Sequence, residues 1–301
     1  MGADNSKPPK YIEKINSSKY TKQIDPFDNI KETNQGKIQS TKLMPPNFLK
    51  MLYQTHGKEL FNILQDKNIK VELEDIKNGI LEIIIKNDEV ELFKKVLNLT
   101  NDPKTFLNET FKDRKIFEHI YGEYAWKIIE EIFQYVDLAY TSNNYISGVI
   151  VGQTILHMAC WSNKYDLIKK IITTDKDILF IADSKGFTPL HMLLIGSYFQ
   201  NHNPAKHSEI YSLICSTYNL SQLLKLFEHT TTQKYKRSEL KYKKDITIPA
   251  GSSFANIVEI VKSLETPENQ KIITENNGMI TEHILKQMSD NNSKNVQIIY
   301  S

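Results

Sequence analysis

Two octapeptides in the middle of the chain match each other at an offset of 34 residues. Residues 152–159 read GQTILHMA and residues 186–193 read GFTPLHML, so a glycine, a threonine, a leucine and a histidine recur in the same order. Matches of this kind at this separation indicate an internal repeat. In a repeat fold each unit is too small to bury its own apolar face, so neighbouring units must stack on one another.

The repeated pattern resembles the core of the ankyrin repeat, G-x-T-P-L-H-x-A, and the earlier copy departs from it mainly at Ile155, where proline is usual. The resemblance implies an all-α fold: an ankyrin-like solenoid of helix–turn–helix units. Threonine caps the first helix, proline suits its first position and glycine supplies the turn. The resemblance assigns a structural role to Gly152, Thr154, Leu156, His157, Gly186, Thr188, Pro189, Leu190 and His191.

Weaker copies of the repeat lie upstream. ILHMACWSNKYDLIKKII aligns with ILEIIIKNDEVELFKKVL at an offset of 75, and IFEHIYGEYAWKIIEEIF fits between them. We therefore predict about five units within residues 45–215, with Asn163 in a left-handed turn between two helices. The repeat leucine falls at Leu49, Leu81, Phe117, Leu156 and Leu190, with spacings of 32, 36, 39 and 34.

The flanking segments differ from this region. Residues 1–44 are polar and carry only isolated apolar residues, so we expect a disordered arm. Residues 216–301 hold no defensible repeat and are expected to form a mixed capping region, with helices at 220–227, 252–264 and 268–289, an extended segment near 234–248, and a short strand at the end. An insertion, SYFQNHNPAK, delays the second helix of the 190 unit to about Ser208.

The repeated histidines have a chemical and a structural interpretation. A catalytic residue need not recur every 34 residues, whereas a structural one must, so the pattern favours structure. His157 and Cys160 are spaced to share a metal or to form a nucleophile–base pair. However, no further ligand pair or orienting residue accompanies them, and Cys160 also suits a small buried position. We predict no catalytic, cofactor-binding or metal site.

The first residues, MGADNSK, fit the N-myristoylation pattern M-G-x-x-x-[ST], with Gly2 as the acceptor. A single acyl chain gives only reversible membrane binding, and lysines further along the arm would add weak attraction to anionic lipid. The alternative is an ordinary polar tail. We expect a cytoplasmic protein, free or tethered to the cytoplasmic face of a membrane, because the sequence has no secretory signal and no apolar run of membrane-spanning length.

The segment KYKRSELKYKK, residues 234–244, carries six basic residues and one acidic residue. This basic run consists of Lys234, Lys236, Arg237, Lys241, Lys243 and Lys244. The formal net charge of the whole chain is only +2, so bulk charge favours no nucleic-acid partner. The run has three interpretations: a solvated loop or edge strand, an anionic-lipid contact, or a nucleic-acid or nuclear-import segment.

The main functional expectation is a non-enzymatic scaffold or adaptor that binds another protein. The resemblance places the contact residues on turn tips and the exposed ends of first helices, where Trp161 and Phe187 are candidate anchors unless they pack against neighbouring units. The predicted surface comprises Gln153, Trp161, Ser162, Ser184, Lys185, Phe187 and Ile195. Similar proteins include adaptors, regulatory subunits and bacterial effectors that act in host cytoplasm. The rivals are an active site after residue 216 and a lipid-binding surface on the basic run.

Overall fold

A computed structural model describes residues 47–66, 69, 71–141, 151–199, 203–239, 244–264, 270–271, 273–275, 278, 282 and 286. The protein is mostly helical, as the sequence predicts. The predicted arm with Gly2 and the predicted terminal strand lie outside the described residues. The chain divides into two compact units, Met1–Ile80 and Leu81–Ser301, which differ from the divisions expected at residues 44 and 215.

The first unit contains three α-helices whose apolar residues lie on one face of each helix. Leu49, Leu52, Leu60 and Leu64 are all buried, which is consistent with their helical spacing in the sequence. The helices are α1 (Phe48–His56), α2 (Leu60–Asp66) and α3 (Leu73–Gly79), with the 3-10 turn η1 (Gly57–Glu59) joining the first two.

In the second unit, most of the helices follow one another as antiparallel pairs. The pairs that correspond to predicted repeats are α4 (Leu81–Lys86) with α5 (Val90–Asn98), α7 (Ile116–Gly122) with α8 (Trp126–Ile132), α9 (Ile155–Trp161) with α10 (Tyr165–Thr174), and α11 (Pro189–Phe199) with α12 (Pro204–Thr217). Short connecting elements are α6 (Pro103–Asn108), β1 (Thr110–Phe111), β2 (Arg114–Lys115), η2 (Phe133–Tyr135) and η3 (Asp177–Phe180).

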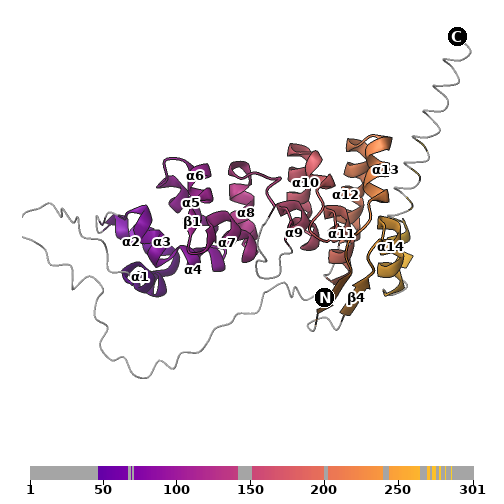
Figure 1. The fold of residues 1–301 in the computed structure, drawn as a ribbon. Helices are drawn as coiled ribbons and strands as arrows, with labels where there is room; N and C mark the ends of the chain where they lie inside the picture. Colours follow the sequence, from indigo (N-terminus) through magenta and orange to yellow (C-terminus); the bar gives the residue numbers. More distant parts are fainter. Residues whose placement is uncertain are drawn as a thin grey trace, which may run out of the picture. The chain divides into compact units, whose positions relative to one another are not determined.

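Helices in equivalent positions pack on one another. The first helix α4 contacts α7, and α9 contacts α11, while among the second helices α5 contacts α8 and α10 contacts α12. Figure 1 shows these helices with their labels. The aligned apolar residues of the second helices are buried, except that Phe133 is only half-buried and lies one residue after the end of α8. The buried residues are Leu92, Phe93, Val96, Leu97, Ile128, Ile129, Ile132, Leu167, Ile168, Ile171 and Ile172.

The turns inside three of the pairs have the same geometry. Asp88, Tyr124 and Asn163 all have positive φ, between 51° and 53°. Each residue donates its N–H to the carbonyl three residues earlier, and the following residue bonds five residues back, as from Lys164 to Ala159. These bonds form a Schellman motif, which satisfies carbonyls at a helix end. The three residues are separated by 36 and 39 positions, the spacings predicted for Leu81, Phe117 and Leu156.

The insertion in the fourth pair behaves differently from the sequence expectation. Helix α11 extends into the predicted insertion and ends at Phe199. Helix α12 begins at Pro204 instead of near Ser208. The earlier start has a local cause, because the Asn203 side chain accepts a hydrogen bond from the Lys206 N–H and proline occupies the first helical position. Helix α12 buries Ile210, Ile214 and Cys215.

After α12 the chain forms α13 (Leu220–Glu228), a two-stranded antiparallel hairpin of β3 (Tyr235–Glu239) and β4 (Lys244–Ile248), and α14 (Phe254–Ser263). The predicted helices near 220 and 252 and the predicted extended segment are therefore confirmed. Helix α14 packs on α11 and α13. No helix within the described residues is long and apolar enough to cross a membrane.

Backbone hydrogen bonds connect four loops of the second unit in a row. We call these loops, residues 151–154, 183–188, 229–233 and 249–253, the loop ladder. The Ser184 N–H donates to the Val151 carbonyl at 2.9 Å, and the Thr232 N–H donates to the Lys185 carbonyl at 2.8 Å. The last step is reciprocal, because Thr231 donates to the Ser252 carbonyl and accepts from the Gly251 N–H. Backbone hydrogen bonds therefore fix the separation of neighbouring loops.

Two glycines of the loop ladder allow a clean test of its close packing. Gly186 and Gly251 have φ of +80° and +78°, but a Cβ at Gly186 would lie 2.6 Å from the Thr232 backbone nitrogen, whereas one at Gly251 would meet nothing within 4 Å. We expect Gly251→Ala to cost about 1–2 kcal/mol for the left-handed backbone alone. Gly186→Ala should cost about 1–3 kcal/mol more, because the neighbouring loop must move. Urea unfolding measures both, and equal losses would contradict the close contact.

Candidate functional site

The region with the most ordered polar geometry is the loop ladder and the helix starts attached to it. At the start of α9, the Thr154 N–H donates to His157 Nδ1 at 3.0 Å, and Thr154 Oγ1 lies 2.9 Å from the same nitrogen. At the start of α11, Thr188 and His191 repeat this arrangement at 3.0 Å for both contacts. The two histidines therefore cap helices, which satisfies N–H groups that have no partner within the helix.

A third copy of this cap begins α14, and sequence reasoning missed it. Gly251 has positive φ like Gly152 and Gly186, and Ser253 replaces the threonine. Asn256 replaces the histidine, because its Oδ1 accepts from the Ser253 N–H at 3.0 Å and from the Ser253 hydroxyl at 2.9 Å. The signal was present as glycine, serine and asparagine at the correct spacing, but it lies 65 residues after the Gly186 copy.

The second ring nitrogens of the two histidines differ in their partners. Since Nδ1 accepts from a backbone N–H in both rings, Nε2 carries the proton in both. His157 Nε2 donates to the Phe187 carbonyl in the next loop at 2.8 Å. The equivalent acceptor for His191 would be the Ser252 carbonyl, but that carbonyl accepts from the Thr231 N–H. His191 Nε2 is buried and has no hydrogen-bond partner within the described part of the chain.

Both cap histidines are neutral at pH 7. Burial lowers the pKa of His157 to about 4, although the bond to the Phe187 carbonyl acts in the opposite direction. Burial lowers the pKa of His191 to about 3, and the neighbouring His229 and His157 rings contribute smaller effects. A ring that stays neutral, faces backbone and has no exposed surface is suited to holding loops together.

Asp183 organises the turn before the second cap. Its Oδ1 accepts from the N–H groups of Lys185 and Phe187, each at 2.9 Å. Burial raises the pKa of Asp183, and these two backbone hydrogen bonds oppose the rise. The Gln153 side chain reaches the other carboxylate oxygen at 3.5 Å, so this predicted surface residue instead links two loops and is buried.

Three further residues of the predicted protein-binding surface are also buried, and the expectation that they face a partner is wrong. Phe187 lies under the hairpin with its ring 5.2 Å from Tyr235. Trp161 is covered by the extended end of α11, where its ring lies 5.4 Å from Phe199. Ile195 lies within α11, every residue of which is buried. The reason is common to all three: later segments of the chain cover the surface that a regular stack would leave open.

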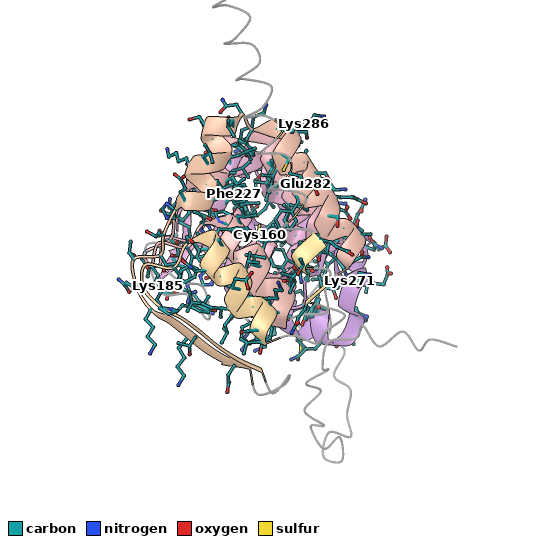
Figure 2. The ribbon with its side chains drawn as sticks, turned by 90° about the vertical axis from the view of Figure 1, so that its right-hand side faces the viewer. Cys160, Lys185, Phe227, Lys271, Glu282 and Lys286 are labelled. Atoms are coloured by element: carbon teal, nitrogen blue, oxygen red, sulfur yellow. The ribbon has the colours of Figure 1, made fainter. Side chains whose placement is uncertain are left out.

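The remaining predicted surface residues stay accessible. Ser184 is exposed, and Ser162 and Lys185 are half-buried. Lys185 extends over the Tyr235 ring, with Nζ 5.7 Å from the ring centre, and Figure 2 shows it beside the hairpin. The loop ladder adds exposed residues that sequence reasoning did not select, namely Thr232 and Gln233.

The basic run forms the hairpin in part. Lys234 and Lys236 are exposed, whereas Tyr235, Ile246 and Ile248 point inward. Arg237 and Lys244 lie in β3 and β4. The predicted residues Lys241 and Lys243 lie outside the described residues.

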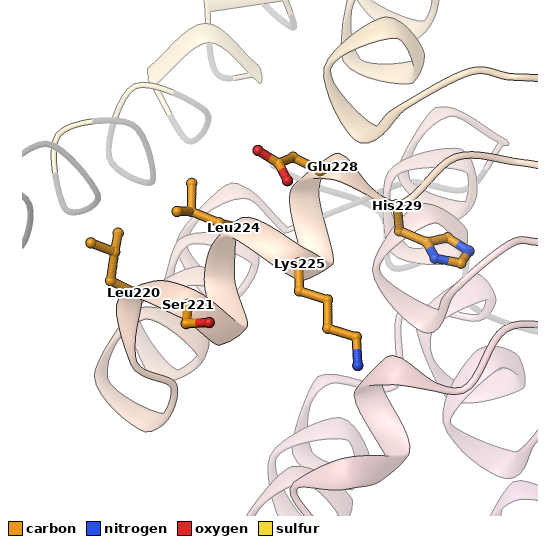
Figure 3. A pocket seen from close by; sticks show the side chains of 6 residues that line it. All are labelled: Leu220, Ser221, Leu224, Lys225, Glu228 and His229. Carbon is orange, nitrogen blue, oxygen red and sulfur yellow. The ribbon is translucent and has the colours of Figure 1, made fainter.

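The region after residue 216 contains a groove along α13, which bears on the rival expectation of an active site there. It is lined by Leu220, Ser221, Leu224, Lys225, Glu228 and His229. Figure 3 shows that its three titratable side chains point in different directions. His229 uses Nε2 to contact the Gly186 carbonyl at 3.1 Å, and Lys225 extends over the Phe180 ring. The groove therefore lacks the convergence of side chains that acid–base chemistry requires.

The two cysteines are free and buried. Burial raises the pKa of both Cys160 and Cys215, which disfavours the reactive thiolate. Within the described ranges no group of three or more His, Cys, Asp or Glu side chains is arranged to hold a metal ion.

No protein-family model matches the chain, and no curated protein matches it.

His157 Nε2 has a hydrogen-bond acceptor and His191 Nε2 does not, so substitutions at the two positions should lower the free energy of unfolding by different amounts. Asparagine keeps the cap acceptor, as Asn256 demonstrates. His157→Asn loses the bond to the Phe187 carbonyl, whereas His191→Asn removes a buried N–H that has no partner. We expect His157→Asn to lower the free energy of unfolding by about 1–3 kcal/mol more than His191→Asn.

Chemical denaturation of the two single variants measures this difference. Both side chains are fully buried, and the same amide is introduced at each site, so the cavity and the new polar group are matched. An equal loss, or a larger loss for His191→Asn, would contradict the assignment.

Proposed function

We propose that this protein is a non-enzymatic scaffold of the ankyrin-repeat type, which binds another protein through the exposed edge of the loop ladder. The main support for the proposal is that two structural features, the cap at a helix start and the left-handed turn between two helices, each recur along the chain. The cap recurs at residues 152–157, 186–191 and 251–256. The left-handed helix–helix turns at Asp88 and Tyr124 add two upstream units, which end in the same way as the unit around Asn163.

The loop ladder is suited to protein recognition because its backbone is held by hydrogen bonds while the side chains of Ser184, Thr232 and Gln233 are exposed. Backbone bonds and buried caps hold the frame. Preorganised backbone lowers the entropic cost of forming a complex. The proposed contact residues are Ser184, Lys185, Thr232 and Gln233, in place of the buried Trp161 and Phe187.

Site-specific photo-crosslinking tests the proposal directly. A photoreactive amino acid at Ser184 or Gln233 should crosslink the full-length protein to a discrete protein partner in a cell extract. The same probe at Lys170 or Thr173, which are exposed on α10, should not. Identical crosslinks from all four positions, or none from the loop ladder, would contradict a binding surface at this edge.

The proposal includes a membrane tether at acylated Gly2, supported by the MGADNSK pattern. Co-expression with an N-myristoyltransferase should remove Met1 and add the mass of one myristoyl group, measured on the intact protein. Gly2→Ala should abolish the added mass, because the acyl chain attaches to the glycine amine. An unmodified wild-type mass would exclude the tether while leaving the crosslinking result unaffected.

A further inference from the structure

The hairpin separates its apolar and basic residues onto opposite faces. Tyr235 pairs with Ile248, and both are buried, as is Ile246. On the other face, Lys236 is paired with Thr247 and both are exposed. Because side chains alternate along a strand, Lys234 lies on the same side as Lys236. The inner face therefore anchors the hairpin on the helices and leaves the outer face free for a partner.

Three lysines gather at this end of the hairpin. Lys185 reaches it from the neighbouring loop and lies over the Tyr235 ring. Lys234 and Lys236 form no ion pair within the described ranges, whereas eight other described lysines lie within ion-pair distance of a carboxylate. The exposed residues of the outer face include one carboxylate, that of Asp245. An uncompensated group of lysines attracts an anionic partner.

The chemistry of this face fits a lipid surface better than a nucleic acid. Sequence-tolerant binding to single strands relies on aromatic rings that stack on bases, but Tyr235 is 3% exposed and faces the protein. Five of the six residues in the basic run are lysines, which act as mobile point charges instead of bidentate phosphate clamps. Anionic headgroups attract such lysines without a fixed geometry.

The geometry points to the exposed Lys234 and Lys236 of the hairpin, together with Lys185 of the neighbouring loop, as a contact for anionic phospholipid membranes. This contact shares Lys185 with the proposed protein-binding edge, but it does not depend on that proposal. It also does not require acylation, although it would supply the second signal that a single myristoyl chain needs for stable attachment.

Vesicle co-sedimentation of the full-length, unacylated protein tests the contact. The wild type should bind vesicles containing phosphatidylserine and not vesicles of phosphatidylcholine alone, and salt should weaken binding. The variant Lys185→Gln, Lys234→Gln, Lys236→Gln should bind at least tenfold more weakly, since each lysine near an anionic surface contributes about fivefold.

Two controls separate this contact from general charge and from misfolding. The variant Lys127→Gln, Lys170→Gln, Lys176→Gln changes the net charge equally at exposed positions outside the hairpin, and should retain binding. Asp245→Asn removes the exposed carboxylate of the outer face and should strengthen binding several-fold. Thermal unfolding of each variant confirms that the helices remain intact.

Three outcomes would overturn the proposal. The first is no binding of the wild type to phosphatidylserine vesicles at low salt. The second is an equal loss in both triple variants, which would assign the effect to net charge. The third is binding of an oligonucleotide that depends on the hairpin lysines without any vesicle binding, which would assign the face to nucleic acid.

Discussion

The hydrogen bonds between neighbouring loops are the constraint on which the rest of the second unit depends. Three of the four loops, 151–154, 183–188 and 249–253, also start a helix, so one short segment both bonds to a neighbouring loop and positions a helix. In these three loops a glycine takes a left-handed conformation that brings neighbouring loops into contact. The side chain three positions after the N-cap residue accepts a hydrogen bond from the N–H of that N-cap residue. When the loops are fixed in this way, α11 is positioned to pack on α9 and on α14.

The segment 229–233 interrupts this regularity and explains several features at once. It lies between the Gly186 and Gly251 loops. The Thr232 N–H donates to the Lys185 carbonyl, and the Thr231 N–H donates to the Ser252 carbonyl. The hairpin that follows covers Phe187 with Tyr235. A single inserted segment thus converts an open edge into a buried one and moves the accessible surface outward.

The sequence was most informative where one residue determines one local geometry. The caps at His157 and His191, the left-handed turn at Asn163 and the apolar faces of the second helices follow from residue type and spacing. The exposure of Phe187 could not be derived in this way, because it depends on where a distant hairpin docks. The burial of α11 was predictable in principle, since PLHMLLIGSYF is apolar on all sides and such a helix must be surrounded. The cap formed by Ser253 and Asn256 was not predicted, because the hairpin lies before it and makes its distance from the preceding cap longer than the repeat spacing.

The insertion also separates two kinds of recognition that a regular repeat would place on the same surface. The frame of the loop ladder satisfies its polar groups internally, so its exposed tips can discriminate by shape and hydrogen bonding. The hairpin instead presents lysines with little internal compensation, which discriminate only by charge. Electrostatic attraction extends over about a Debye length and tolerates many orientations of the two partners. Shape complementarity stabilises a complex only when the surfaces are in contact. A protein that used both would first be held near an anionic surface and would then select its partner, and the two steps would respond differently to salt.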